Sequence, residues 1–192
     1  MPPDALAVLV IGLTMASGMI ALASMPPGSA VVITVGVMVF APLYVGVPLG
    51  AMGWVRAAHG PPALFWLIAL IMVSDSAQYY VGTLLGRRKL APVVSPGKTV
   101  EGAIGGLVIG PIAGIAIGWW ALPALSMQTV GALSVVLVVF GIMGDLFESL
   151  LKRSVGAKDS SALIPGHGGV LDRIDAYLFA APVYYMFLRY VA

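Results

Sequence analysis

The sequence predicts an all-α protein, a polytopic transmembrane helix bundle with about six spans. Apolar residues make up 60% of the 192-residue chain, against about 45–50% in soluble domains. The mean hydropathy is +1.02, and the uninterrupted apolar runs are too long for buried strands or ordinary core helices. No polar linker divides these runs. We therefore expect a single integral membrane domain over residues 1–192.

Six apolar runs are the candidate spans. They cover residues 5–23, 30–55, 63–85, 102–122, 129–151 and 175–191. The first run ends like a signal-peptidase site, but no basic region precedes it, so we expect a retained helix rather than a cleaved signal. A turn at 25–29 and a loop at 56–62 separate the first three runs. Pro42 and Pro48 interrupt the second run, which we expect to be one kinked or tilted span; two short half-spans are the alternative.

Glycine recurs at every fourth residue of the fourth run. The stripe consists of Gly102, Gly106, Gly110, Gly114 and Gly118. Small residues at this spacing let a neighbouring helix approach closely. We therefore expect a packing face. The fifth run follows a short turn around Pro123, and the sixth contains six aromatic side chains.

Two polar loops, 86–101 and 152–174, contain eight of the ten lysines and arginines. With six spans, both loops lie on one side of the membrane, and the positive-inside rule assigns that side to the cytoplasm. The net charge of +2 gives no indication of a nucleic-acid partner. The absence of cysteine excludes disulfides and thiolate metal sites.

Topology requires lysine and arginine, but it does not require acids. Asp75 lies within the third run, Asp145 within the fifth, and Asp172 just before the sixth. An acid inside a span costs about 2.5–3.5 kcal/mol on insertion scales, which indicates a functional site. Hard oxygen ligands without cysteine favour Mg²⁺ over zinc. We predict Asp75, Asp145 and Asp172 as metal ligands; the alternative is that each only pairs with lysine or arginine inside the bundle.

Basic residues accompany these acids in a pattern suited to a polyphosphate. They are Lys98, Lys152, Arg153, Lys158 and Arg173. Residues 95–102 precede the fourth run and can present backbone N–H groups and a helix N-terminus to an anion, although they lack the glycine spacing of a Walker A motif. From its chemistry alone, the sequence predicts metal-dependent phosphoryl or nucleotidyl transfer at a membrane.

Residues 149–175 contain the pattern Ser-x-x-Lys-Arg, four residues, Lys-Asp, then Pro-x-His-Gly-Gly-x-x-Asp-Arg-x-Asp. This pattern resembles the signature of the phosphatidate cytidylyltransferases, also called CDP-diacylglycerol synthases. Residues 74–79 and 95–102 resemble two other polar blocks of that family. The chain departs from the family at Gly97, Val100 and Gln78, where relatives often have lysine, tryptophan and alanine, and members are usually longer.

The resemblance implies transfer of CMP from CTP to phosphatidate, giving CDP-diacylglycerol and pyrophosphate, in a multi-pass protein of the cell membrane. It implies Mg²⁺ as cofactor, membrane lipids as partners, no nucleic acid and an active site facing the cytoplasm. A second cation such as K⁺ and a homodimer are left open. The expected catalytic residues are Asp145, Lys152, Arg153, Lys158, Asp172 and Asp175. The expected substrate-binding residues are Ser95, Lys98, Thr99, Glu101, Asp159, His167, Gly168, Gly169 and Arg173.

His167 is not expected to act as a general base. The second pKa of a phosphate monoester is near 6, so the phosphate of phosphatidate is already an oxyanion at neutral pH. We expect His167 to hydrogen-bond a phosphate or to brace its loop, which is rich in glycine.

Three alternatives remain. A CTP-dependent polyprenol kinase would transfer the γ-phosphoryl group and would need a base near the acceptor hydroxyl, and the complete signature disfavours it. A non-enzymatic ion or solute transporter would be supported by inverted halves, and the polar blocks show no such symmetry. The third alternative is a catalytically inactive relative.

Overall fold

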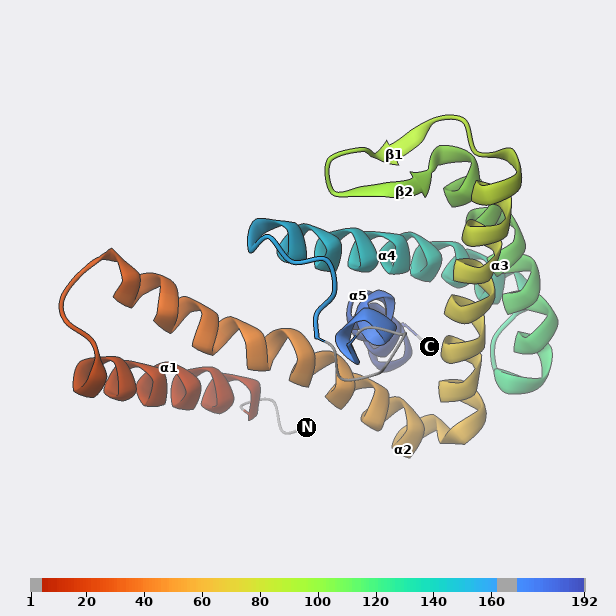
Figure 1. The fold of residues 1–192 in the computed structure, drawn as a ribbon. Coiled ribbons are helices and arrows are strands. Elements are labelled where there is room, and N and C mark those ends of the chain that lie inside the picture. Colours follow the sequence, from red (N-terminus) through yellow and green to blue (C-terminus); the bar gives the residue numbers. More distant parts are fainter. Residues whose placement is uncertain (1–4, 162–168, 192) are drawn as a thin grey trace. The chain divides into compact units, whose positions relative to one another are not determined.

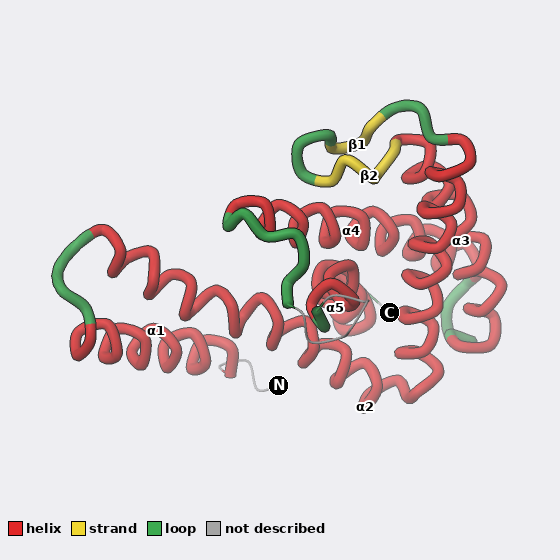
Figure 2. Tube along the Cα trace, viewed as in Figure 1, coloured by secondary structure: helices red, strands yellow, loops and turns green. Residues whose placement is uncertain are grey.

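The computed structural model describes residues 5–161 and 169–191. In these residues it has five helices and one two-stranded antiparallel sheet (Figures 1 and 2). The elements are α1 (Ala5–Ser24), α2 (Ser29–Leu85), β1 (Lys89–Ala91), β2 (Ser95–Thr99), α3 (Val100–Ala121), α4 (Met127–Ser154) and α5 (Leu171–Tyr190). Among the described residues, α1, α2, α3 and α4 are long and apolar enough to cross a membrane. The prediction of an all-α membrane protein is confirmed.

The number of membrane-length helices differs from the prediction: residues 5–161 and 169–191 contain four, where about six spans were expected. The predicted loop at 56–62 is mostly helical, and α2 runs through it for 57 residues with one non-helical residue, Gly60 (φ 83°, ψ 171°). Glycine reaches this φ without strain. Pro61 and Pro62 follow it, and the missing N–H of a proline costs nothing in the first turn of a helix. A single non-helical residue, Gly60, therefore separates the two helical segments of α2, where a loop was expected.

The predicted sixth span corresponds to α5, which is not among the four. Charged residues in its first turns, Asp172, Arg173 and Asp175, and the tyrosines that follow lower its hydropathy. The helix nevertheless packs against α4, and Ala180, Ala181 and other residues along it are buried.

The chain divides into two compact units, Met1–Val47 and Pro48–Ala192. The first contains α1 and the beginning of α2; there the Ser17 hydroxyl donates to the Leu13 carbonyl at 2.7 Å, and the rings of Phe40 and Tyr44 stack with centroids 5.3 Å apart. The second contains the rest of α2 and all later elements. The single domain expected over residues 1–192 stays a prediction.

The glycine stripe of α3 faces other helices of the second unit, and all five of its glycines are buried. A Cβ atom at Gly102 would lie 2.6 Å from the backbone oxygen of Gln78 on α2, and one at Gly118 would lie 2.5 Å from Cγ1 of Val130 on α4. Atoms cannot approach so closely without a shift of the neighbour. The predicted packing role of the stripe is confirmed.

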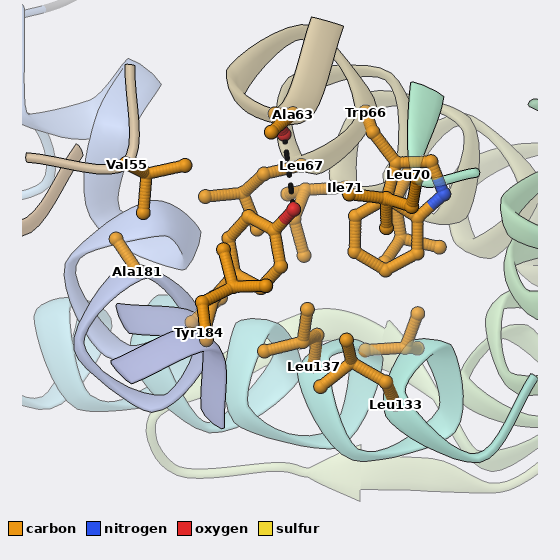
Figure 3. Packing of buried hydrophobic residues seen from close by; sticks show 14 of the residues in the cluster. Val55, Ala63, Trp66, Leu67, Leu70, Ile71, Leu133, Leu137, Ala181 and Tyr184 are labelled. Carbon is orange, nitrogen blue, oxygen red and sulfur yellow. Dashed lines mark hydrogen bonds between the residues drawn. The ribbon is translucent and has the colours of Figure 1, made fainter. Parts of the chain in front are cut away.

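The core of the second unit contains side chains from α2, α4 and α5 (Figure 3), together with Ala121 of α3. The Tyr184 hydroxyl of α5 donates to the Ala63 carbonyl of α2 at 3.2 Å, and the Trp66 indole donates to the Gly114 carbonyl of α3 at 2.8 Å. Both rings are fully buried. The buried hydroxyl of Tyr184 and the buried indole N–H of Trp66 therefore each have a partner, and these two bonds connect α2 to α5 and α3.

The polar loop predicted at 86–101 contains the β1–β2 hairpin (Figure 2). Lys89 is opposite Thr99, and Ala91 is opposite Ser95. The second strand leads directly into α3, where the Thr99 hydroxyl caps the helix by accepting the Gly102 N–H at 3.1 Å. Because β2 also contacts α4, this loop is a fixed element between two helices.

Candidate functional site

A cavity of about 770 Å³ lies in the second unit. Its lining comes from α2, both strands, α3, α4 and α5. The predicted site residues that line it are Asp75, Ser95, Lys98, Thr99, Asp145, Asp172, Arg173 and Asp175. Residues separated by up to 100 positions are thus brought to one place, with both acidic and basic side chains around the same space.

The acids of the cavity are close enough to influence one another. The charge of Asp145 on α4 acts on both Asp75 of α2 and Asp175 of α5. Oδ1 of Asp75 accepts a hydrogen bond from Gln78 Nε2 at 2.9 Å, one helical turn further on. Asp145 forms an ion pair with Lys98 of β2. An array of this kind repels itself unless cations enter, and Lys98 is one such cation.

A buried charge network lies at the end of α4. Lys152 Nζ is 2.5 Å from Oε2 of Glu148, one turn earlier on the same helix, and 2.7 Å from Oδ1 of Asp172 on α5. Glu148 is 1% exposed, and no hydrogen bond of good geometry reaches its carboxylate from the described residues, so Lys152 is its partner by charge. Buried carboxylates require such a partner.

The carboxylate of Asp172 accepts hydrogen bonds from Lys152, Ser160 and Gly169. Burial alone would raise the pKa of its carboxyl group, but the hydrogen bonds from Lys152, the Gly169 N–H and Ser160 outweigh burial and hold this pKa well below the usual range. The Gly169 N–H donates at 2.7 Å, and the Ser160 N–H and hydroxyl donate at 3.0 and 2.8 Å. Asp172 therefore stays ionised and fixes the chain on both sides of residues 162–168.

The predicted metal ligands are carboxylates, which are oxygen donors of the kind that Mg²⁺ uses. In residues 5–161 and 169–191, no three His, Asp or Glu side chains form a group that could hold a metal ion by themselves. Two of the three predicted ligands have lysine partners, Asp145 with Lys98 and Asp172 with Lys152. Mg²⁺ in nucleotide enzymes usually takes one or two carboxylates and completes its shell with water and substrate phosphates. The oxygen donors of this cavity fit a cation that arrives with a polyphosphate.

Other predicted site residues do not line the cavity. Lys152 is paired with Asp172 and is not a lining residue, and Lys158 and Asp159 are exposed. Glu101 accepts hydrogen bonds from the backbone N–H groups of Arg87 and Arg88, at 3.0 and 3.1 Å.

Two more predicted site residues form hydrogen bonds that involve the backbone, and two are not among the residues that the structure describes. Arg153 donates to two backbone carbonyls, and Gly169 contributes its N–H to Asp172. His167 and Gly168 lie outside the described residues.

One face of α2, which forms a wall of the cavity, was not predicted from the sequence. Met72, Ser76, Tyr79 and Thr83 follow one another at helical spacing, and all four are exposed and line the cavity. The spacing of Met72 and Tyr79 from Asp75, three and four residues, was the available signal. Glu148 was not among the predicted site residues, although its spacing of four from Lys152 predicts the pair that the structure contains.

Comparison with known proteins identifies relatives of this chain. A family model described as the cytidylyltransferase family matches residues 2–191. The phosphatidate cytidylyltransferase of Bacillus subtilis (strain 168) is 39% identical over 156 residues, which cover 80% of this chain and 58% of that protein. The phosphatidate cytidylyltransferase of Haemophilus influenzae is 43% identical over 141 residues, 69% of this chain and 48% of that protein.

A third relative is named only as the uncharacterized protein YnbB of Escherichia coli (strain K12). It is 45% identical over 131 residues, which cover 68% of this chain and 44% of that protein. The chain therefore spans about half the length of the curated relatives it matches. The family match itself extends over almost every residue of the sequence, and on this ground the chain belongs to the cytidylyltransferase family.

Proposed function

We propose that this chain transfers CMP from CTP to phosphatidate at the cytoplasmic surface of the membrane, giving CDP-diacylglycerol and pyrophosphate. The observation that carries the proposal is the cavity lined by Asp75, Lys98, Asp145, Asp172 and Arg173 in a chain of membrane-length helices. The curated relatives named phosphatidate cytidylyltransferase support the choice of substrates.

The composition of the cavity wall suits one lipid and one water-borne substrate. Met72 and Tyr79 lie on the exposed face of α2, a helix apolar enough to lie in lipid. Lys98 and Arg173 stand among the acids of the same cavity. The lipid phosphate can therefore approach along α2 while the nucleotide phosphates bind to the cations.

In the proposed reaction, a phosphate oxygen of phosphatidate attacks the α-phosphorus of CTP. A new P–O bond forms as the bond to the bridging α–β oxygen breaks, and pyrophosphate leaves with the electron pair. No base is required, because the attacking phosphate is already ionised at neutral pH. The chain contributes orientation and neutralisation of phosphate charge.

Lys98 has a defined part in this scheme. Its ammonium group is paired with Asp145 in the structure, and it can exchange that partner for a phosphate oxygen when the nucleotide enters. Asp75, Asp145 and Asp172 would hold Mg²⁺, which when bound would neutralise phosphate charge and orient the triphosphate. Lys152 keeps Asp172 ionised and in place.

The position of a radioactive label decides between the proposal and its nearest alternative. The purified chain in lipid nanodiscs is given Mg²⁺, phosphatidate, a polyprenol and CTP labelled at either the α- or the γ-phosphate. We expect the α-label, and not the γ-label, in the lipid extract. Asp145→Asn should lower this transfer by about 100-fold or more, whereas Arg56→Gln, at an exposed residue away from the cavity, should leave it unchanged.

The other outcomes contradict the proposal. Transfer of the γ-label would identify a lipid kinase. Failure of either label to enter lipid, with the chain folded and in the membrane, would remove the enzymatic function. Full activity in Asp145→Asn would separate the reaction from this cavity.

A further inference from the structure

We infer that Arg153 is a positioning residue: it ties the turn of the β1–β2 hairpin to the segment after α4 and so holds Lys98 at the cavity. The inference rests on the proposed function for its kinetic consequence. Its structural content, a guanidinium bridge between two backbone segments, can be tested separately.

The bridge uses two different nitrogen atoms of one side chain. Arg153 Nε donates to the carbonyl of Val94 at 3.3 Å, and Nη1 donates to the carbonyl of Ala157 at 3.2 Å. Val94 lies in the turn between β1 and β2, and Ala157 lies after α4. A guanidinium group presents its donors in a rigid fork, so one arginine can fix two acceptors at a set separation.

The end of α4, which carries Arg153, is held by backbone hydrogen bonds. Arg153 is in the last turn of α4, where the Ala157 N–H donates to the Lys152 carbonyl at 2.9 Å and the Gly156 N–H donates to the Arg153 carbonyl at 3.1 Å. Gly156 has a φ of 70°, which a residue with a side chain rarely adopts. The backbone around Arg153 is therefore well ordered by hydrogen bonds, and from it the side chain contacts the hairpin at Val94.

The hairpin has strands of only three and five residues, and residues of β2 line the cavity. Contacts that hold the hairpin therefore also position these lining residues. Ser95, Gly97 and Lys98 belong to β2 and line the cavity. The end of the hairpin near the helices is held by the Glu101 carboxylate, which accepts the N–H groups that precede β1. The turn end is reached by Arg153. Loss of Arg153 would free the turn while leaving the other end in place.

Arg153 itself is exposed and does not line the cavity. The catalytic role that the sequence suggested requires contact with substrate, whereas the positioning role acts through Lys98. The two roles differ in what they predict without substrate: only a positioning residue changes the hairpin in the substrate-free chain.

The test measures the hairpin directly. The sequence contains no cysteine, so cysteines introduced at Val93 and Val155 can be spin-labelled selectively. Both side chains are exposed, at 88% and 77%, one in the hairpin turn and one at the end of α4. In the full chain we expect a narrow distance distribution by pulsed EPR without substrate. Arg153→Gln and Arg153→Lys should both broaden it, since a lysine ammonium cannot reproduce the two-pronged fork.

A matched control and a kinetic readout complete the test. Arg56→Lys, a change of the same type at an exposed residue remote from the hairpin in sequence, should leave the distribution narrow. Arg153→Lys should raise KM for CTP by about tenfold, the order expected for a lost charged hydrogen bond, and should change kcat less. If Arg153→Gln does not insert in the membrane, Arg153→Lys decides the question.

An unchanged distance distribution in the arginine variants would overturn the inference. If the distribution broadens while even the parent chain lacks transferase activity, the bridge stands and the proposed function fails. If the distribution is unchanged while kcat falls with KM constant, Arg153 contacts the reacting groups directly.

Discussion

At the scale of single residues, several acids of the site are paired with lysines before any substrate arrives. Lys98 forms an ion pair with Asp145, and Lys152 is shared between Glu148 and Asp172. The residues of the first pair line the cavity, where an entering phosphate can reach them. The second network is more deeply buried, since Lys152 and Asp172 side chains are 17% and 13% exposed. We propose that the Lys98–Asp145 pair opens to bind substrate phosphate. We propose that the Lys152 network stabilises the fold and keeps Asp172 in place.

Replacement of Lys152 should therefore destabilise the protein. Lys152→Met leaves the fully buried Glu148 and the neighbouring Asp172 without their shared cation. Removal of one member of a buried ion pair typically costs about 3–5 kcal/mol. The measurement is the free energy of unfolding in detergent. Lys158→Met, the same change at an exposed residue, should stay within about 0.5 kcal/mol of the parent, and an equal loss in both variants would contradict the assignment.

At the scale of elements, the site depends on two close approaches. The glycines of α3 bring this helix against α2, which carries Asp75. The β1–β2 hairpin precedes α3, and its second strand contacts α4 (Figure 1). A change in the α2–α3 spacing would therefore displace both Asp75 and Lys98.

Alanine at Gly102 tests this spacing. The new Cβ would lie 2.6 Å from the Gln78 carbonyl oxygen, a backbone atom that cannot move aside alone. Overpacking of this kind costs about 1–3 kcal/mol, and we expect a lower thermal midpoint together with reduced transferase activity. Gly53→Ala on α2, where nothing lies within 4 Å of the new atom, should keep the parent midpoint or raise it. A Gly102→Ala variant as stable and active as the parent would show that the helices can separate without consequence.

Part of this architecture could be predicted from the sequence, because apolar runs and acids within them carry strong physical signals. Asp75 and Asp145 stood out since a charge in a span is costly. The hairpin was not predicted, because Pro92, Pro96 and Gly97 interrupt any alternation of apolar and polar residues that would indicate strands. The break of α2 was expected as a loop, although Gly60 and the prolines after it make it with one residue.

The pairing of charges could not be predicted either. Lys98 and Asp145 are 47 positions apart, and spacing along a chain does not determine which helices meet. The alternative in which the acids pair with lysines describes Asp145 and Asp172 in the structure, while Asp75 has Gln78 as its hydrogen-bond partner.

At the scale of the whole molecule, the described cavity residues all belong to the second compact unit, Pro48–Ala192. This unit combines membrane-length helices with a polar cavity, which is what a reaction between a lipid and a nucleotide requires. The central claim is that the acids of the cavity act together on a nucleotide and its divalent cation.

The most direct test is a titration of Mn²⁺, as a paramagnetic substitute for Mg²⁺, followed by EPR on the purified chain. Because no three acids of the described residues form a metal site by themselves, we predict tight Mn²⁺ binding to the protein only when CTP is present. Asp75→Asn and Asp145→Asn should each weaken this binding by about tenfold or more, whereas Asp4→Asn, far from the cavity residues in the sequence, should not. CTP-dependent Mn²⁺ binding that is unaffected in both cavity variants, or no such binding in the parent chain, would contradict the account.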